Sequence, residues 1–156
     1  MNKIAIIIPS RLEAVRLPNK PLKLINNKEM ILHVYHAAKK TNTGEVYVAT
    51  PDQKIIDLIK KNDGKAVLTS LNHQTGTDRV HEVFKDRLNC EPNIIINLQG
   101  DMPNIDPKAI TNLISYMNKG KCDIGTLASS FSSDTEIADE NSCLLYTSPS
   151  PRDSCA

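Results

Sequence analysis

Short apolar runs separated by amphipathic segments dominate the pattern of this chain. Five runs have the length of a strand: residues 4–8, 46–49, 66–68, 94–98 and 124–127. Apart from Asn97, Gly125 and Thr126, the residues of these runs are apolar and do not alternate with polar ones, which is typical of strands buried on both faces. Each run is therefore predicted to be a strand inside a mostly parallel sheet.

The segments between these runs repeat apolar residues at the spacing of an amphipathic helix. Their apolar faces are Met30, Val34, Ala37 and Ala38; Ile55, Ile56 and Ile59; Val80, Val83, Phe84 and Leu88; and Ile110, Leu113, Ile114 and Met117. Strand and helix thus alternate along the chain. This order predicts an α/β fold of three layers, in which helices cover both faces of a mostly parallel sheet.

Capping residues and glycines mark the expected helix ends. A capping side chain followed by proline predicts helix starts at Asp106–Pro107 and at Thr50–Pro51, the latter with Asp52 in its first turn. Gly44 and Gly64 each stand just before a strand, where a helix C-terminus needs a left-handed residue. We therefore expect both glycines to end helices.

Composition narrows the class of protein. The 156 residues are 40% hydrophobic and carry a net charge of +1, which fits one globular domain and disfavours a general nucleic-acid binder. No apolar run approaches the length of a membrane span, and the N-terminus lacks the layout of a signal peptide. The four cysteines form no CxxC pair, which disfavours a zinc site and suits reduced thiols in the cytoplasm.

The last residues differ from the rest. Residues 143–156 show no period and have the proline and serine content of a loop or disordered end. They also resemble the conceptual translation of a sequencing-library adapter. We therefore expect a domain over residues 1–142 and a non-native or disordered tail over residues 143–156.

The loop after the first predicted strand is rich in cations. It carries Arg11, Arg16, Lys20 and Lys23 against a single carboxylate, Glu13. Such a loop leaves the carboxyl end of a parallel strand, where open α/β sheets bind their ligands. A nucleoside triphosphate is an anion that suits several gathered cations, so this loop is predicted to bind phosphates. The alternative is a solvated basic loop. Pro18 and Pro21 stiffen the loop and therefore disfavour this alternative.

Two further loops leave the carboxyl ends of predicted strands, at residues 72–79 and 99–103, so the three loops are expected to line one crevice. Asp101 is the predicted Mg²⁺ ligand, because hard cations take carboxylate and phosphate oxygens. Gly100 before it would allow close approach of the backbone to a ligand. The alternative is an ordinary turn of Gly-Asp-Met-Pro.

The middle loop offers hydrogen-bonding groups for a base or a sugar. His73, Gln74, Thr75 and Thr77 supply the donors and acceptors. The alternative is structural: Thr75 or Thr77 caps the following helix, while Asp78 and Arg79 are surface charges. Spacing alone leaves both interpretations open.

At these three loops the chain resembles the 3-deoxy-manno-octulosonate (Kdo) cytidylyltransferases, also called CMP-Kdo synthetases. The matching segments are residues 8–11 (IPSR), 16–22 (RLPNKPL), 73–79 (HQTGTDR) and 97–103 (NLQGDMP). The resemblance runs in register from Lys3 to Ser142. It implies the N-terminal part of the nucleotide-diphospho-sugar transferase fold.

The chain departs from the family pattern at three positions. Ala14 replaces a small hydroxyl residue, Asn19 a glycine and Met102 a glutamate. Asparagine tolerates left-handed backbone angles, so Asn19 is the mildest change. Ala14 removes a hydrogen bond, and Met102 removes a charge beside Asp101.

The resemblance implies a reaction and a set of site residues. CMP would pass from CTP to the anomeric hydroxyl of Kdo, with release of pyrophosphate, to give CMP-Kdo for lipopolysaccharide biosynthesis. The implied roles are phosphate binding by Arg11, Arg16 and Lys20, magnesium binding by Asp101, and substrate binding by His73, Gln74, Thr77, Arg79 and Gln99.

The family's chains are longer, and their second halves supply another metal-binding carboxylate, much of the sugar-acid pocket and the dimer contacts. We therefore expect a cytoplasmic homodimer for the full-length protein, and an inactive, poorly soluble polypeptide for these 156 residues alone. The alternatives are a nucleotidyltransferase for another sugar, such as a CMP-sialate synthetase, and a non-catalytic nucleotide-binding fragment.

Overall fold

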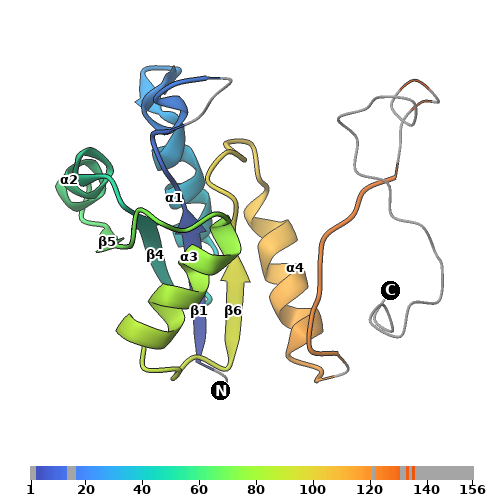
Figure 1. Ribbon diagram of the computed structural model, residues 1–156. Helices are drawn as coiled ribbons and strands as arrows, with labels where there is room; N and C mark the ends of the chain where they lie inside the picture. Colours follow the sequence, from blue (N-terminus) through green and yellow to red (C-terminus); the bar gives the residue numbers. More distant parts are fainter. Residues whose placement is uncertain (1–2, 14–16, 121, 131–132, 134, 136–156) are drawn as a thin grey trace. The chain divides into compact units, whose positions relative to one another are not determined.

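The computed structural model describes residues 3–13, 17–120, 122–130, 133 and 135 (Figure 1). Residues 14–16 and the tail from residue 143 lie outside these ranges. The chain divides into two compact units, residues 1–111 and 112–156, which are described separately. Every strand of the described residues belongs to the first unit.

Four strands of the first unit form one parallel sheet: β1 (Ile4–Pro9), β4 (Glu45–Thr50), β5 (Lys65–Leu68) and β6 (Ile94–Asn97). Their spatial order is β5-β4-β1-β6, and every neighbouring pair is parallel. The first four predicted strands are therefore confirmed. Because the chain runs outward from β1 to β5 and then returns to the other side of β1, the sheet has a topological switch point at β1, where open α/β sheets bind ligands.

Helices cover both faces of this sheet, as the sequence predicts. On one face, Ala5 and Ile7 of β1 pack with Val80 of α3 (Gly76–Glu82) in a buried cluster. The opposite face is covered by α1 (Met30–Lys40), which lies behind the sheet in Figure 1, and by α2 (Gln53–Lys61). The side chains of Ile31 of α1 and Ile8 of β1 both lie next to Gly100.

Three smaller elements complete the first unit. The loop after β1 contains a 3₁₀ turn, η1 (Lys20–Leu22), and a short hairpin of β2 (Leu24–Ile25) and β3 (Lys28–Glu29). The hairpin turns at Asn26 and Asn27, whose φ values of 50° and 61° suit the tight turns that match strand twist. After α3 the chain continues as a π-helical turn, η2 (Val83–Arg87).

One expected strand is absent. Residues 124–127 have no strand structure, and the side chains of Ile124 and Leu127 are 82% and 47% exposed. A strand needs a hydrogen-bonded neighbour, and none of the described residues pairs with this run. The prediction of a fifth buried strand is therefore wrong for this structure. The helix predicted before it is present as α4 (Pro107–Met117), and Asp106 accepts a hydrogen bond from the Lys108 N–H at 2.9 Å.

The expected start of α2 is also wrong. Thr50 ends β4, and the helix begins at Gln53 with Asp52 as its N-cap residue. The carboxylate of Asp52 makes no capping hydrogen bond, because it accepts the N–H of Leu12 at 2.8 Å instead. The side chain of Asp52 thus binds the loop after β1, whereas the local pattern places it in the first turn of α2.

Neither Gly44 nor Gly64 is the left-handed residue that ends a helix, and both allow close packing. The left-handed residues after α1 and α2 are Asn42, with a φ of 51°, and Asp63, with a φ of 54°. A Cβ on Gly44 would lie 2.3 Å from the carbonyl oxygen of Ile4, and one on Gly64 would lie 2.5 Å from Ile59. Both glycines are needed because neighbouring atoms leave no room for a side chain.

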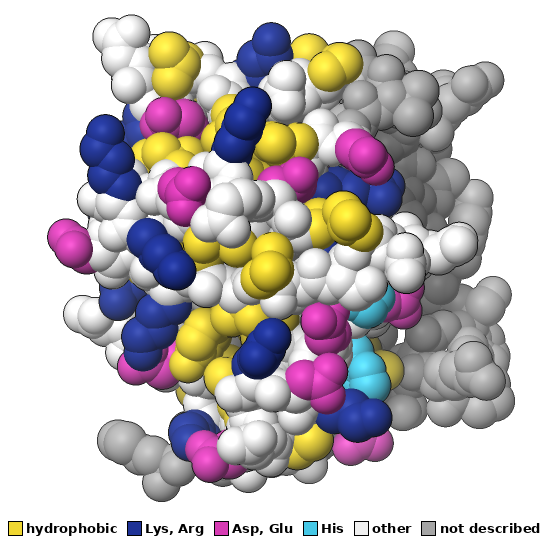
Figure 2. All heavy atoms as spheres, turned by 60° about the vertical axis from the view of Figure 1, so that its left-hand side comes forward, with side chains coloured by type: hydrophobic (Ala, Val, Ile, Leu, Met, Phe, Trp, Pro, Cys, Tyr) yellow, Lys and Arg dark blue, Asp and Glu magenta, His cyan; other side chains and the backbone are white. Residues whose placement is uncertain are grey.

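The outer strand β5 borders a face of mixed character. Leu68 at its end and Leu71 in the following loop are 53% and 75% exposed. Figure 2, which brings this side of the molecule forward, shows apolar side chains surrounded by interspersed positive and negative ones. None of the described helices is long and apolar enough to cross a membrane.

Candidate functional site

A cavity of about 360 Å³ lies at the carboxyl ends of β1, β5 and β6. All three loops that the sequence predicts to share a crevice contribute to it. The polar and charged side chains in its lining are Ser10, Arg11, Glu13, Lys20, His73, Gln74, Thr75, Arg79, Gln99 and Asp101. The cavity therefore stands at the switch point of the sheet and combines cations, carboxylates and hydrogen-bonding groups.

The first loop is held in place at both of its described ends. Asp52 accepts the N–H of Leu12, and the carbonyl of Leu12 accepts the N–H of Asn19 at 3.1 Å. Asn19 is left-handed, with a φ of 57°, directly before η1. Asparagine thus adopts the conformation for which the resembling family uses glycine, and this turn sets the position of Lys20. Arg16 lies outside the described residues, so its placement stays a prediction.

Lys20 joins the first loop to the third. Its Nζ donates to Oδ2 of Asp101 at 2.8 Å, and the two side chains are 37% and 51% exposed. An ion pair this exposed contributes little stability, about 0–1 kcal/mol, so either partner is free to exchange its contact for a ligand. Gly100 allows the third loop to pack closely against the end of β1, because a Cβ at this position would lie 2.8 Å from the carbonyl oxygen of Pro9.

Arg79 is buried and not a surface charge. Only 3% of it is exposed, and its Nη1 donates to Oγ1 of Thr69 and, at 2.9 Å, to the carbonyl of Ser70. Burial lowers the pKa of Arg79; Glu82 opposes this shift, and the nearby positive charge of Arg11 adds to it. Two guanidinium groups close to each other in one cavity favour the binding of an anion.

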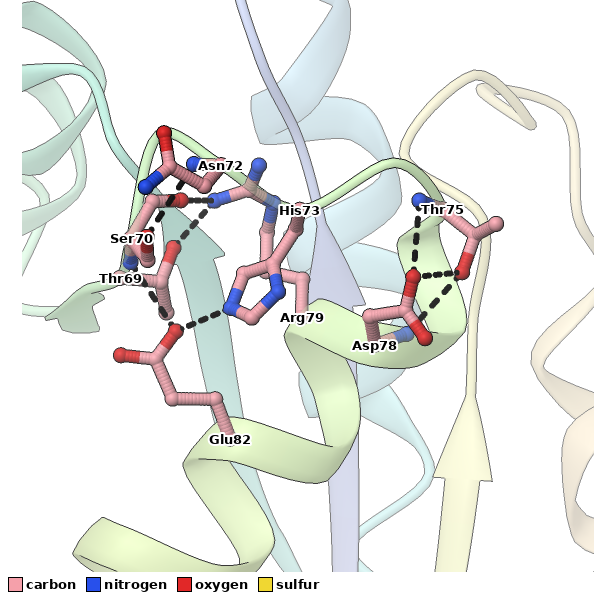
Figure 3. Close-up of polar contacts among 8 residues, drawn as sticks. All are labelled: Thr69, Ser70, Asn72, His73, Thr75, Asp78, Arg79 and Glu82. Carbon is pink, nitrogen blue, oxygen red and sulfur yellow. Dashed lines mark hydrogen bonds and ion pairs between the residues drawn. The ribbon is translucent and has the colours of Figure 1, made fainter.

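Thr75 caps α3, which confirms the capping interpretation for this residue, and Asp78 completes a capping box with it. Oγ1 of Thr75 accepts the N–H of Asp78, and Oδ2 of Asp78 accepts the N–H of Thr75, each at 3.1 Å (Figure 3). Oγ1 of Thr75 also donates to Oδ2 of Asp78 at 2.7 Å, and this hydrogen bond, together with the one from the Thr75 N–H, lowers the pKa of Asp78. Thr77 lies one residue inside the helix start; its Oγ1 accepts a long hydrogen bond of 3.4 Å from Asn97.

His73 is paired with Glu82, which sequence analysis did not identify. Nε2 of His73 contacts Oε2 of Glu82, and the same oxygen accepts the N–H of Ser70 at 3.0 Å (Figure 3). Burial would raise the pKa of Glu82, but hydrogen bonds from His73 and Ser70 and the charge of Arg79 outweigh it and lower that pKa. The signal in the sequence is the spacing of Arg79 and Glu82, which places both on one face of α3.

Gln74 and Gln99 both line the cavity, and their role in substrate binding stays a prediction. Nε2 of Gln99 donates to Oδ1 of Asn97 at 3.2 Å. Gln99, Asn97 and Thr77 therefore form a short polar chain from the third loop to the start of α3.

A metal ion at this site would have few protein ligands. Among the described residues, no three His, Cys, Asp or Glu side chains gather closely enough to hold a metal by themselves. Asp101 offers a half-exposed carboxylate, and Glu13 lines the same cavity. Magnesium is commonly held by one or two carboxylates together with phosphate oxygens and waters, so this donor set fits a metal that arrives with a phosphate ligand.

These features define the first unit as an α/β protein whose parallel sheet carries, at its switch point, a cavity lined by a cationic loop, a carboxylate and a polar loop. The sequence matches the cytidylyltransferase family over residues 5–150. The chain therefore belongs to the cytidylyltransferases.

Named relatives agree with this family. The chain is 45% identical over 124 residues to the 3-deoxy-manno-octulosonate cytidylyltransferase of Rickettsia bellii (strain OSU 85-389), which covers 79% of this chain and 51% of the relative. It is 38% identical over 160 residues to the enzyme of the same name from Thermodesulfovibrio yellowstonii, covering 93% and 63%. The chain thus spans about half to two thirds of the length of these curated relatives.

A solved structure supports the fold. The structure of CMP:2-keto-3-deoxy-manno-octonic acid synthetase in complex with CTP superposes on this chain with a TM-score of 0.71 at 42% identity. The matched region covers 75% of this chain and 48% of that structure. The expected nucleotide-diphospho-sugar transferase fold is confirmed for this part of the protein.

Proposed function

We propose that this chain carries the CTP-binding part of a CMP-Kdo synthetase, which transfers CMP from CTP to the anomeric hydroxyl of Kdo. Family membership and the names of the relatives support this reaction. The observation that carries the proposal is the contact between Lys20 and Asp101 in a cavity that also contains Arg11. A cation of the first loop and the carboxylate of the third therefore face the same cavity.

In this proposal Arg11, Arg16 and Lys20 bind the triphosphate. Lys20 pairs with Asp101 in the cavity. A triphosphate would give Lys20 a second anionic partner, and Arg11 would stabilise the same phosphates. Gathered cations offset the charge that develops on pyrophosphate as it leaves.

Asp101 would hold the divalent cation, for which Mg²⁺ is our proposal. When bound, such an ion would supply positive charge that offsets the negative charge of the phosphates. The carboxylate of Asp101 is 51% exposed and can reach a ligand without first being uncovered. Met102 supplies no second charge beside it, so Asp101 would act as the principal carboxylate of this loop.

His73, Gln74, Thr77 and Arg79 would shape the nucleotide side of the pocket, and Gln99 would contact the sugar acid. The hydroxyl oxygen of the sugar then attacks the α-phosphorus of CTP while the bond from that phosphorus to pyrophosphate breaks. Such a displacement depends on in-line positioning and charge stabilisation more than on covalent chemistry. The fixed loops around the cavity would supply that positioning.

The wider setting is proposed with the reaction. CMP-Kdo would be used for lipopolysaccharide assembly, and the full-length protein would be a homodimer in the cytoplasm. Since the chain spans about half of the Rickettsia relative's length, we expect these 156 residues to bind CTP but not to complete the transfer alone.

Calorimetry with CTP, UTP and ATP in the presence of Mg²⁺ tests the nucleotide part of the proposal. CTP is expected to bind most tightly to the 156-residue chain. A pyrophosphate-release assay with CTP and either Kdo or a sialic acid tests the reaction in a chain extended to the length of the relatives. Preference for UTP or ATP, or turnover with sialic acid in place of Kdo, would contradict the proposal.

A further inference from the structure

Two side chains of α3 hold the loop that connects β5 to this helix. Arg79 donates to Thr69 and Ser70 at the start of the loop. Glu82, nearly one turn further along α3, accepts the N–H of Ser70 and pairs with His73 (Figure 3). His73 and Arg79 line the cavity, whereas Glu82 is not among the described residues that line it.

The surroundings of this pair strengthen it. The side chains of His73 and Glu82 are each 21% exposed, so solvent screens their interaction less than that of a surface pair. A carboxylate on one ring nitrogen of a histidine fixes the orientation of the ring. It also leaves the other nitrogen, here Nδ1 of His73, for a ligand.

We propose that Glu82 is a positioning residue of the nucleotide site, which acts through His73 and touches no ligand itself. It fixes the His73 ring and the Ser70 amide before a ligand arrives, so less ordering remains to be done on binding. This inference rests on the proposed function, because the nucleotide is the ligand that His73 would meet.

A double-mutant cycle in CTP binding tests the proposal on the 156-residue chain with Mg²⁺. Glu82→Gln is expected to weaken CTP binding about fivefold, equivalent to about 1 kcal/mol. The same change made together with His73→Gln is expected to cost less than about twofold, because the group through which Glu82 acts is already gone. Glu45→Gln, which removes the carboxylate paired with Lys65 at the other end of the sheet, is the matched control and should leave CTP affinity unchanged.

A structural role alone would give a different result. If Glu82→Gln weakened binding equally with and without His73, or did not weaken it, the proposal would be overturned. Nucleotide-free NMR gives a second readout: a hydrogen-bonded ring N–H signal of His73, present in the wild type and in Glu45→Gln, and lost or shifted in Glu82→Gln. Absence of that signal from the wild type would also overturn the proposal.

The same titrations separate this inference from the proposed function. If the wild type prefers CTP but the cycle shows no coupling, only the role of Glu82 fails. If the wild type prefers UTP or ATP, the proposed function fails, and the cycle is judged with the preferred nucleotide. If no nucleotide binds, both proposals fail.

Discussion

The two ends of the parallel sheet use similar charged pairs in different surroundings. At the carboxyl ends, both side chains of the His73–Glu82 pair are 21% exposed, and the neighbouring Arg79 is buried. At the amino ends, the Lys3–Glu91 and Lys65–Glu45 pairs have side chains that are 55–60% exposed. Solvent weakens the exposed pairs at the amino ends, so we expect them to contribute little to stability. We expect the less exposed His73–Glu82 pair to hold its loop in place.

Both ends also carry a hollow, and the difference between the hollows points to the site. The amino-end hollow, of about 240 Å³, is lined by residues that include Lys3, Arg87 and Glu91. The carboxyl-end cavity is the one formed by the three motif-bearing loops and contains the Lys20–Asp101 contact. Both hollows contain cations, so cations alone do not identify the site. The three loops that converge on the carboxyl-end cavity do identify it.

The largest expected effect comes from removing Arg79. Arg79→Ala should lower the free energy of unfolding by about 3 kcal/mol, because Glu82 loses a buried counter-charge and two loop oxygens lose their donor. Urea denaturation measures this change. Arg87→Ala, which truncates an exposed arginine on η2, should change stability by less than about 0.5 kcal/mol, and equal losses in the two variants would contradict the comparison.

Lys20 should affect binding and leave folding almost unchanged. Lys20→Ala is expected to weaken CTP binding about 20-fold, or by about 2 kcal/mol, because a charge-assisted contact to phosphate is lost. Lys23→Ala changes an exposed lysine of the same loop that is not in the cavity lining, and it should leave CTP affinity within about twofold of the wild type. Calorimetry measures both, and a similar loss in the two variants would indicate only non-specific attraction.

Glu82 should make stability depend on pH in the acid range. Its pKa is lower in the folded chain than in the unfolded one, so its stabilisation is present above the unfolded pKa and disappears as the pH falls through the folded pKa. Urea unfolding between about pH 3 and pH 7 should show a decline toward low pH, and Glu82→Gln should lose about 1.5 kcal/mol near neutrality and flatten that decline. A wild-type decline that Glu82→Gln leaves unaltered would place its origin elsewhere.

The smallest effect is expected at the amino ends of the strands. Glu91→Gln breaks the exposed pair with Lys3 and should lower the free energy of unfolding by less than about 0.5 kcal/mol. Raising the salt concentration should reduce even this difference. A loss as large as that of Arg79→Ala would mean that exposure does not separate the two ends of the sheet.

The sequence predicts four strands of the sheet and the helices around them because their burial leaves a local record. The runs that became β1, β4, β5 and β6 lie in a sheet with helices on both faces, and all residues of these runs except Asn97 are apolar. Residues 124–127 (Ile-Gly-Thr-Leu) are less apolar and have no strand partner among the described residues, and no local pattern reports whether a partner is present. The short hairpin was missed because two-residue strands are too brief for periodicity, although Asn26-Asn27 was its signal.

The site was predictable to the extent that its residues follow strands. Lys20 and Asp101 come from loops at the same sheet edge, which is why their proximity follows from the topology. The roles of Asp52 and Glu82 could not be predicted, because tertiary packing selects their partners, Leu12 and His73. Both hold loops in place, a function that motifs for ligand contact do not report.

A crystal structure of the chain with CTP and Mg²⁺ tests the central claim most directly. The account predicts that the triphosphate lies in the carboxyl-end cavity, with Arg11 and Lys20 donating to its phosphates and Asp101 facing them from the third loop. A triphosphate bound in the amino-end hollow beside Lys3 and Arg87, or one that leaves Lys20 and Asp101 joined only to each other, would contradict it.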